Sequence, residues 1–314
     1  MLPDAPLRQW VVSYPFELMG RLAFQPELLC AVERIVMDAI SRFLAPRGTQ
    51  SGGVMVRHRF GGAVNLHVHA HLLVVDGGYR EVDGKVRFEG ARALSRADLD
   101  GLATQIHRRL VRLCQRRGVF KAKEGNQEEQ LDALAACGRA ALASGARERR
   151  GPALSLAEED EVEHPSGGGV GRCGGLNVYA SPVIDGNDRE TLERVCRYLL
   201  RGPIALLRLR MRPDGMVEYR MKKADRRGNT VMVMHPVDLL MRLCSLIPAP
   251  GRPTRKYFGV LAPRAKLRAD MVPRVTARAK ASLLSPASRR RGLATIRQIG
   301  STQAAMSSAD ATFP

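Results

Sequence analysis

Apolar and polar residues alternate along residues 64–75, a pattern typical of a β-strand. Residues 54–60 predict a preceding strand, and Gly61-Gly62 predicts the tight turn that joins the two. A helical spacing of apolar residues covers 24–44, and a second one, with an arginine-rich face, covers 95–117. Strands and helices in this order, without a regular βαβ repeat, indicate an α+β fold.

The chain after residue 121 divides into three parts. Residues 122–187 lose periodicity and are acidic or glycine-rich, which predicts an insertion or a flexible loop. Residues 188–282 are expected to be ordered again, and residues 283–314 are expected to form a disordered basic tail. The elements predicted in the ordered part are a helix over 188–201, a strand pair at 217–221 and 230–234, and a helix that begins at His235.

Charge points to the class of partner. The formal net charge is +19, and residues 251–314 alone hold 13 Lys and Arg against 2 Asp. Such an excess predicts a polyanionic partner, because clustered cations release counterions when they bind phosphates. The chain has no apolar stretch near the ~18 residues of a membrane span and no signal-peptide core, so we expect a cytoplasmic protein without a membrane partner. Six scattered cysteines argue against a zinc module and against a disulfide framework.

Histidines mark the candidate chemistry. His67, His69 and His71 account for three of the seven histidines in the chain, and strand alternation places them on one face. A polar, solvated strand face is the simpler explanation, but the apolar run that follows predicts a buried strand whose imidazoles need partners. A metal ion meets that need. A turn near residue 62 sets His58 opposite His67 as a further ligand, and Asp76 is a weaker candidate. The two histidines predicted to be structural are His107 and His235.

Several segments resemble one family. The string from Arg59 to Tyr79, which contains His69-Ala70-His71, resembles the His-hydrophobic-His motif of the HUH endonucleases. In particular it resembles the rolling-circle transposases of bacterial insertion sequences and the related common-region elements. Three further segments match the same family in the same order: Arg8–Phe16, Arg197–Ile204 and Tyr257–Pro263.

The resemblance implies a fold and a site. It implies an antiparallel sheet that carries the histidine strand, flanked by helices, with 1–121 and 188–282 as the two parts of one catalytic domain. His69 and His71 would hold Mg²⁺ or Mn²⁺, with His58 and His67 as further candidates. The resemblance also makes Tyr198 the nucleophile. Relatives with two tyrosines carry the other one four residues earlier, where this chain has Arg194, so it resembles the single-tyrosine members.

The spacing around Tyr198 is compatible with that role. On the predicted helix, Arg194 and Arg201 lie on the side of Tyr198, at i−4 and i+3. With Arg197 they would neutralise a phosphate held for attack. Spacing alone also allows a tyrosine that completes the core while the arginines are solvated.

These observations predict a metal-dependent endonuclease and strand transferase. Its partners would be single-stranded DNA at element ends and at the target, within the bacterial cytoplasm at the nucleoid. A replication initiator or a relaxase would use the same chemistry, and a non-catalytic basic DNA-binding remnant would share the charge. Relatives often begin with a zinc-finger-like segment before the stretch that matches Arg8, so we expect a shortened copy. The oligomeric state, the DNA sequence recognised and the activity of this copy stay open.

Overall fold

The computed structural model describes residues 2–119, 168–221, 224, 228–248, 251 and 253–272. The described residues between Asp4 and Met271 form one compact unit, to which everything below refers. The predicted disorder of 283–314, and the predicted loop as far as residue 167, lie outside the described residues. No described helix is both long enough and apolar enough to cross a membrane.

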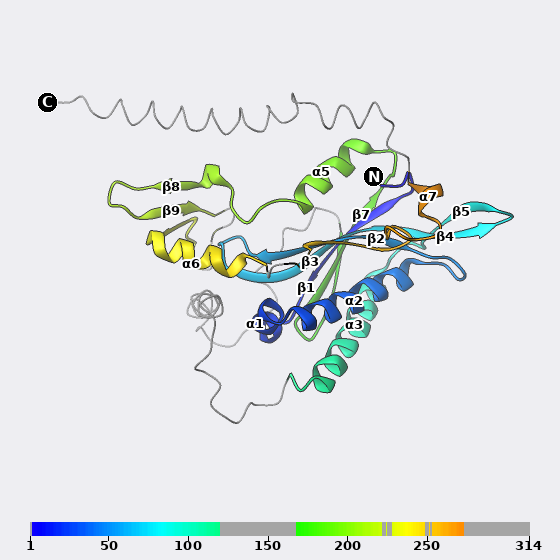
Figure 1. The fold of residues 1–314 in the computed structure, drawn as a ribbon, viewed down its shortest axis with the longest axis horizontal. Coiled ribbons are helices and arrows are strands. Elements are labelled where there is room, and N and C mark those ends of the chain that lie inside the picture. The colour runs from blue at the N-terminus through cyan, green and yellow to red at the C-terminus, as the bar shows by residue number, and fades with distance from the viewer. Residues whose placement is uncertain are drawn as a thin grey trace. The chain divides into compact units, whose positions relative to one another are not determined.

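A six-stranded sheet forms the centre of this unit (Figure 1). Every neighbouring pair of its strands is antiparallel, which confirms the predicted α+β fold with an antiparallel sheet. The strand that carries the predicted histidines lies inside the sheet, between two neighbours. In spatial order the strands are β11 (Arg255–Gly259), β2 (Gly52–Phe60), β3 (Leu66–Val75), β1 (Leu7–Ser13), β7 (Leu176–Ile184) and β6 (Gly169–Cys173).

Three helices cover one face of this sheet, and a fourth lies on the other (Figure 1). The covering helices are α1 (Phe16–Phe24), α2 (Pro26–Leu44) and α3 (Arg96–Arg116). Val68, Ala70 and Leu72 of β3 are buried in one apolar cluster with residues of these helices. Because side chains alternate along a strand, the histidines of β3 point to the opposite face. On that face lies α5 (Arg189–Leu199).

The predicted helices are confirmed, with one boundary changed. The helix expected over 24–44 is α2, which begins two residues later, at Pro26, and α1 precedes it as a separate helix that the sequence analysis did not predict. Proline is favoured in the first helical turn, where its missing N–H has no intrahelical acceptor. Helix α3 begins at a reciprocal hydrogen-bonded cap between Ser95 and Asp98.

The register of the β2–β3 hairpin differs from the prediction by two residues. His58 pairs with His69, not with His67. The connection is longer than a turn at Gly61-Gly62, because the Gly61 N–H donates to the carbonyl of Asn65 at 3.0 Å. A register shift between His58 and Phe60 adds to the difference. His58 therefore lies directly beside one member of the predicted metal pair.

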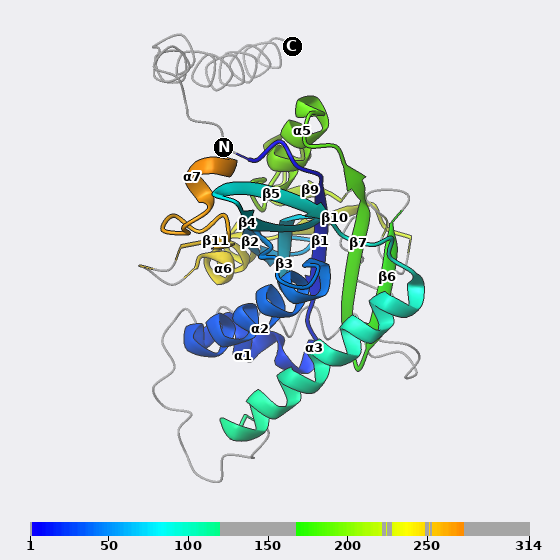
Figure 2. The same cartoon turned by 90° about the vertical axis from the view of Figure 1, so that its right-hand side faces the viewer.

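The loop predicted over 122–187 extends too far, because its last part forms strands. Residues 169–184 are not a loop but form β6 and β7 at one side of the main sheet, with α3 beside them (Figure 2). The glycines that suggested disorder allow close packing instead. A Cβ on Gly171 would collide with the backbone carbonyl of Leu99 at the start of α3. Glycine composition alone cannot distinguish these two uses.

Smaller elements complete the described unit. The predicted strand pair is confirmed as β9 (Val217–Arg220) and β10 (Val231–Met234), joined in a three-stranded sheet by β8 (Leu209–Met211). His235 caps the helix that follows, since its Nδ1 accepts from the Val237 N–H at 3.2 Å, and the prediction that it is structural is confirmed. The remaining elements are β4 (Gly77–Val82), β5 (Lys85–Gly90), the 3₁₀ turn η1 (Leu206–Arg208), α6 (Pro236–Leu246) and α7 (Arg268–Met271).

Candidate metal centre and tyrosine helix

Three histidines from two neighbouring strands converge on the face of the sheet that α5 covers. The ligand atoms of His58, His69 and His71 all lie within 4.8 Å of one another. The ring of His71 is 4.3 Å from that of His58 and 4.9 Å from that of His69, measured between centroids. All three side chains are buried. The group could hold one metal ion.

Hydrogen bonds decide which ring nitrogens can serve as ligands. His58 Nε2 lies 2.7 Å from the carbonyl oxygen of Leu199, and His69 Nδ1 lies 3.0 Å from that of His67. A carbonyl oxygen only accepts, so these two nitrogens carry the protons and donate. The lone pairs are then on His58 Nδ1 and His69 Nε2. Both atoms are buried, and neither has a hydrogen-bond partner in the described part of the chain.

Burial keeps these imidazoles neutral. Burial, together with the positive charge of Arg201 and against the opposing effect of the Leu199 carbonyl, lowers the pKa of His58 to about 4. Burial also lowers the pKa of His69 well below its ordinary value, helped by the neighbouring His71, His67 and His58. Neutral imidazole is the form that binds a metal. A donor set with its protons turned away from the centre therefore fits a cation.

Two of the candidate ligands lie outside this group. The ring of His67 is 5.0 Å from that of His69, on the same face, but His67 does not belong to the set of atoms within 4.8 Å. Asp76 is buried and forms a two-pronged ion pair with Arg8, at 2.8 and 3.1 Å. Its carboxylate is thus already used where β3 ends, away from the histidines.

Helix α5 places Tyr198 against the cluster. The helix begins at Asp188, whose carboxylate accepts from the Thr191 N–H, and it is anchored by the buried Leu192 and Leu199. The Tyr198 ring meets the His71 ring edge-on, with 5.4 Å between the centroids. The last turn of α5 is also bonded to the site through the Leu199 carbonyl and His58. Residues 127 and 141 positions apart in sequence thus meet at one point.

The three predicted arginines differ in position. The Arg201 guanidinium lies 4.4 Å from the centre of the Tyr198 ring. Arg194 instead donates to the Thr191 hydroxyl, and the exposed Arg197 pairs with Glu193 at 2.7 Å along the helix surface. The structure therefore brings one arginine of the three, Arg201, to the tyrosine.

A comparison with protein families shows the family of this chain. A family profile described as "Putative transposase" matches residues 52–268, more than half of the chain. The chain belongs to this transposase family. The matched range contains the strands of the histidine cluster and the tyrosine helix. No curated protein and no solved structure matches the transposase.

The transposase has a second tyrosine on this face that the sequence analysis missed. Tyr179 on β7 pairs with Val11 of β1, and Val11 pairs in turn with His71. Cross-strand partners share a face, so Tyr179 lies in the same row as His71. Burial raises the pKa of Tyr179 to about 12, and Tyr198 adds to that shift. The alternation of side chains along β7 could have placed Tyr179 on this face, but β7 lies within the loop predicted over 122–187.

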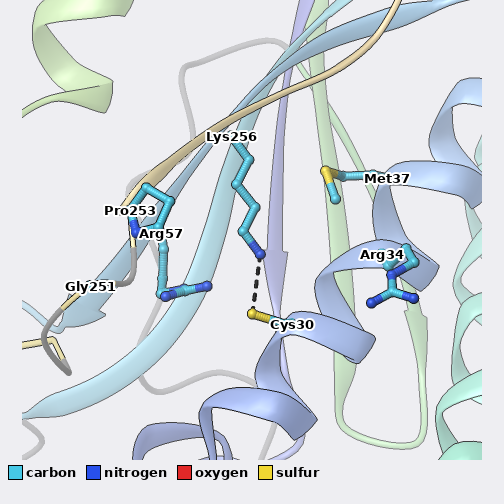
Figure 3. A pocket seen from close by; sticks show the side chains of 7 residues that line it. All are labelled: Cys30, Arg34, Met37, Arg57, Gly251, Pro253 and Lys256. Carbon is cyan, nitrogen blue, oxygen red and sulfur yellow. Dashed lines mark hydrogen bonds between the residues drawn. The ribbon is translucent and has the colours of Figure 1, made fainter. Parts of the chain in front are cut away.

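The opposite face of β2 carries a different polar cluster, beneath α2. Glu33 of α2 accepts from Arg57 at 2.5 Å and from Lys256 at 2.6 Å. Lys256 also donates to the Cys30 thiol at 3.4 Å, and a cavity of about 370 Å³ opens beside them (Figure 3). These cations already have a carboxylate partner. This cavity is separated from the histidines by the sheet.

Proposed function

We propose that this transposase is a metal-dependent single-strand DNA endonuclease of the HUH class, acting in rolling-circle transposition. The observation that carries the proposal is the contact of Tyr198 with His71, beside the three-histidine group and under Arg201. A phenol hydroxyl is a weak nucleophile near neutral pH and needs cationic help. The site supplies that help from a positive guanidinium and from a ligand set suited to a cation.

Each residue of the site would have its own role in the reaction. The Tyr198 hydroxyl would attack a phosphodiester in line, forming its oxygen–phosphorus bond as the bond to the 3′ oxygen breaks. The products are a 5′-phosphotyrosine and a free 3′-hydroxyl, which takes up a proton. The reverse step on another strand joins the DNA. Arg201 would stabilise the charge that develops on the phosphate, while Leu192 and Leu199 keep α5 in place.

His58, His69 and His71 would hold the cation. When bound, a divalent ion polarises the scissile phosphate and holds it in line with the nucleophile. Imidazole suits Mn²⁺ better than Mg²⁺, which prefers oxygen ligands, so between the two predicted ions we favour Mn²⁺. A replication initiator or a relaxase would use the same chemistry, and membership of a transposase family favours transposition.

The test is covalent trapping. The purified chain is incubated with labelled single-stranded DNA bearing candidate element ends, with Mn²⁺ or with EDTA. We expect a protein–DNA adduct that requires the metal and is absent in Tyr198→Phe. Tyr257→Phe is the control, since Tyr257 lies on the edge strand β11 with its ring 5.8 Å from the Arg268 guanidinium, and this variant should form the adduct normally. Tight binding without an adduct on any end would instead indicate a DNA-binding remnant.

A further inference from the structure

The small sheet β8–β9–β10 has two faces of different character. On one face, Tyr219 of β9 pairs with Leu209 of β8 and with Met232 of β10. Val217 and Met234 extend this face, and they are buried with Tyr219 in the main apolar cluster. This face attaches the small sheet to the rest of the described unit.

The other face is open and mixes arginine with valine. By alternation it carries Arg210, Glu218, Arg220, Val231 and Val233. Both arginines are exposed, and the two valines are 38% and 42% exposed. β-branched side chains normally leave the solvent side of a sheet to polar residues. Their exposure on the edge strand β10, beside Arg220 and Glu218, indicates a surface that another molecule covers.

Charge indicates what kind of molecule that is. Residues 208–227 include eight Lys and Arg against three Asp and Glu. Within the described residues, neither Arg210 nor Arg220 forms an ion pair, whereas the nearby Arg212 pairs with Asp214 at 3.1 Å. Unpaired cations beside apolar methyl groups match the edge of a DNA groove, which presents phosphates together with thymine methyl groups.

We propose that this open face of β8–β10 binds double-stranded DNA next to the strand that Tyr198 cleaves. Neighbouring strands lie ~4.8 Å apart, so a short sheet of this width fits against a major groove about 12 Å wide. The face is close to the nucleophile in the chain, since β8 follows Arg201 after a short connection that includes η1. The proposal rests on the proposed function, and it adds a paired segment to the single strand that is cut.

The test compares duplex binding by matched variants of the full chain. The variant Arg210→Ala/Arg220→Ala removes two charges from the open face. The control Arg80→Ala/Arg87→Ala removes two charges from another exposed hairpin, where these arginines are cross-strand partners on β4 and β5. Fluorescence anisotropy over a salt series would use a labelled duplex of about 20 base pairs and a single strand of the same length.

We expect the open-face variant to lose roughly tenfold in duplex affinity, with a shallower salt dependence by about two ions. Single-strand affinity should change far less, the control should stay near wild type, and Arg210→Lys/Arg220→Lys should recover most of the loss. Equal losses of duplex affinity in the open-face variant and the control would show that binding depends on the overall charge of the protein, and would overturn the proposal. So would a loss confined to the single strand, or an unchanged duplex affinity. Because this readout is binding, it stays interpretable even where no covalent adduct forms.

Discussion

Arg57 and His58 are neighbours on β2, and each belongs to a buried polar cluster on its own face of the sheet. Under α2, Arg57 and Lys256 both bind Glu33, so buried charges neutralise each other inside the protein. Under α5, three buried imidazoles meet, and the buried His58 Nδ1 and His69 Nε2 have no hydrogen-bond partner among the described residues. The first arrangement is complete without a ligand. The second leaves a desolvation cost that a cation would repay.

The comparison teaches how to separate structure from function among buried polar groups. Both clusters are polar and largely buried, so neither property identifies the site. The difference is whether the partners come from the chain. Four predictions test that difference.

The first prediction removes the shared carboxylate. Glu33→Ala should lower the free energy of unfolding by about 3–5 kcal/mol, because it leaves the buried Arg57, and the half-buried Lys256 beside it, without their carboxylate partner. Urea unfolding followed by circular dichroism measures the change. Glu17→Ala, exposed on α1, is the control and should cost no more than about 1 kcal/mol. A similar small cost for Glu33→Ala would show that the cluster contributes little to stability.

The second prediction concerns the histidine cluster and its ion. Adding Mn²⁺ at about a hundred times its dissociation constant should raise the free energy of unfolding by about 2.7 kcal/mol, and EDTA should reverse the gain. His69→Asn should lose this response. His107→Asn, on α3, is the matched control and should keep it. Equal responses in both variants would place the ion elsewhere.

The third prediction uses acid in place of a metal. The pKa of His58 is about 4 in the folded chain and returns to its ordinary value of 6.5 on unfolding. Between those pH values the unfolded chain therefore binds a proton that the folded chain does not. Stability in EDTA should be fully present above pH 6.5 and should fall as the pH drops toward 4. The fall should be smaller in His58→Asn, as measured by urea midpoints at pH 7.5 and 4.5. Equal falls would assign the acid sensitivity to other groups.

The smallest effect is expected at Tyr179. The variant Tyr179→Phe keeps the ring on Val11 and removes the hydroxyl, so the rate of adduct formation should change by less than about fivefold. Loss of Tyr198 should cost more than about a thousandfold, since it removes the bond-forming oxygen. A residual adduct in Tyr198→Phe that disappears in the double variant Tyr179→Phe/Tyr198→Phe would instead make Tyr179 a second nucleophile.

Local patterns predicted much of the fold because they follow from the geometry of single elements. A period of two set the histidines of β3 on one face, and the helix predicted over 188–201 contains α5. The strands β6 and β7 were missed because glycine that permits close packing looks, in composition, like glycine in a loop. The strand β7 pairs with β1, which lies more than 160 residues earlier in the chain.

The candidate site was predicted in its residues but not in its geometry. The sequence by itself determined that His69 and His71 share a strand face and that Tyr198 lies on a helix, since both depend on backbone periodicity. Tertiary structure decided that His58 rather than His67 joins the pair, because hairpin register depends on how many residues the loop uses. It also decided that Arg201, and not Arg194 or Arg197, lies against Tyr198. Such choices depend on how a helix and a sheet distant in sequence pack together, which no local pattern encodes.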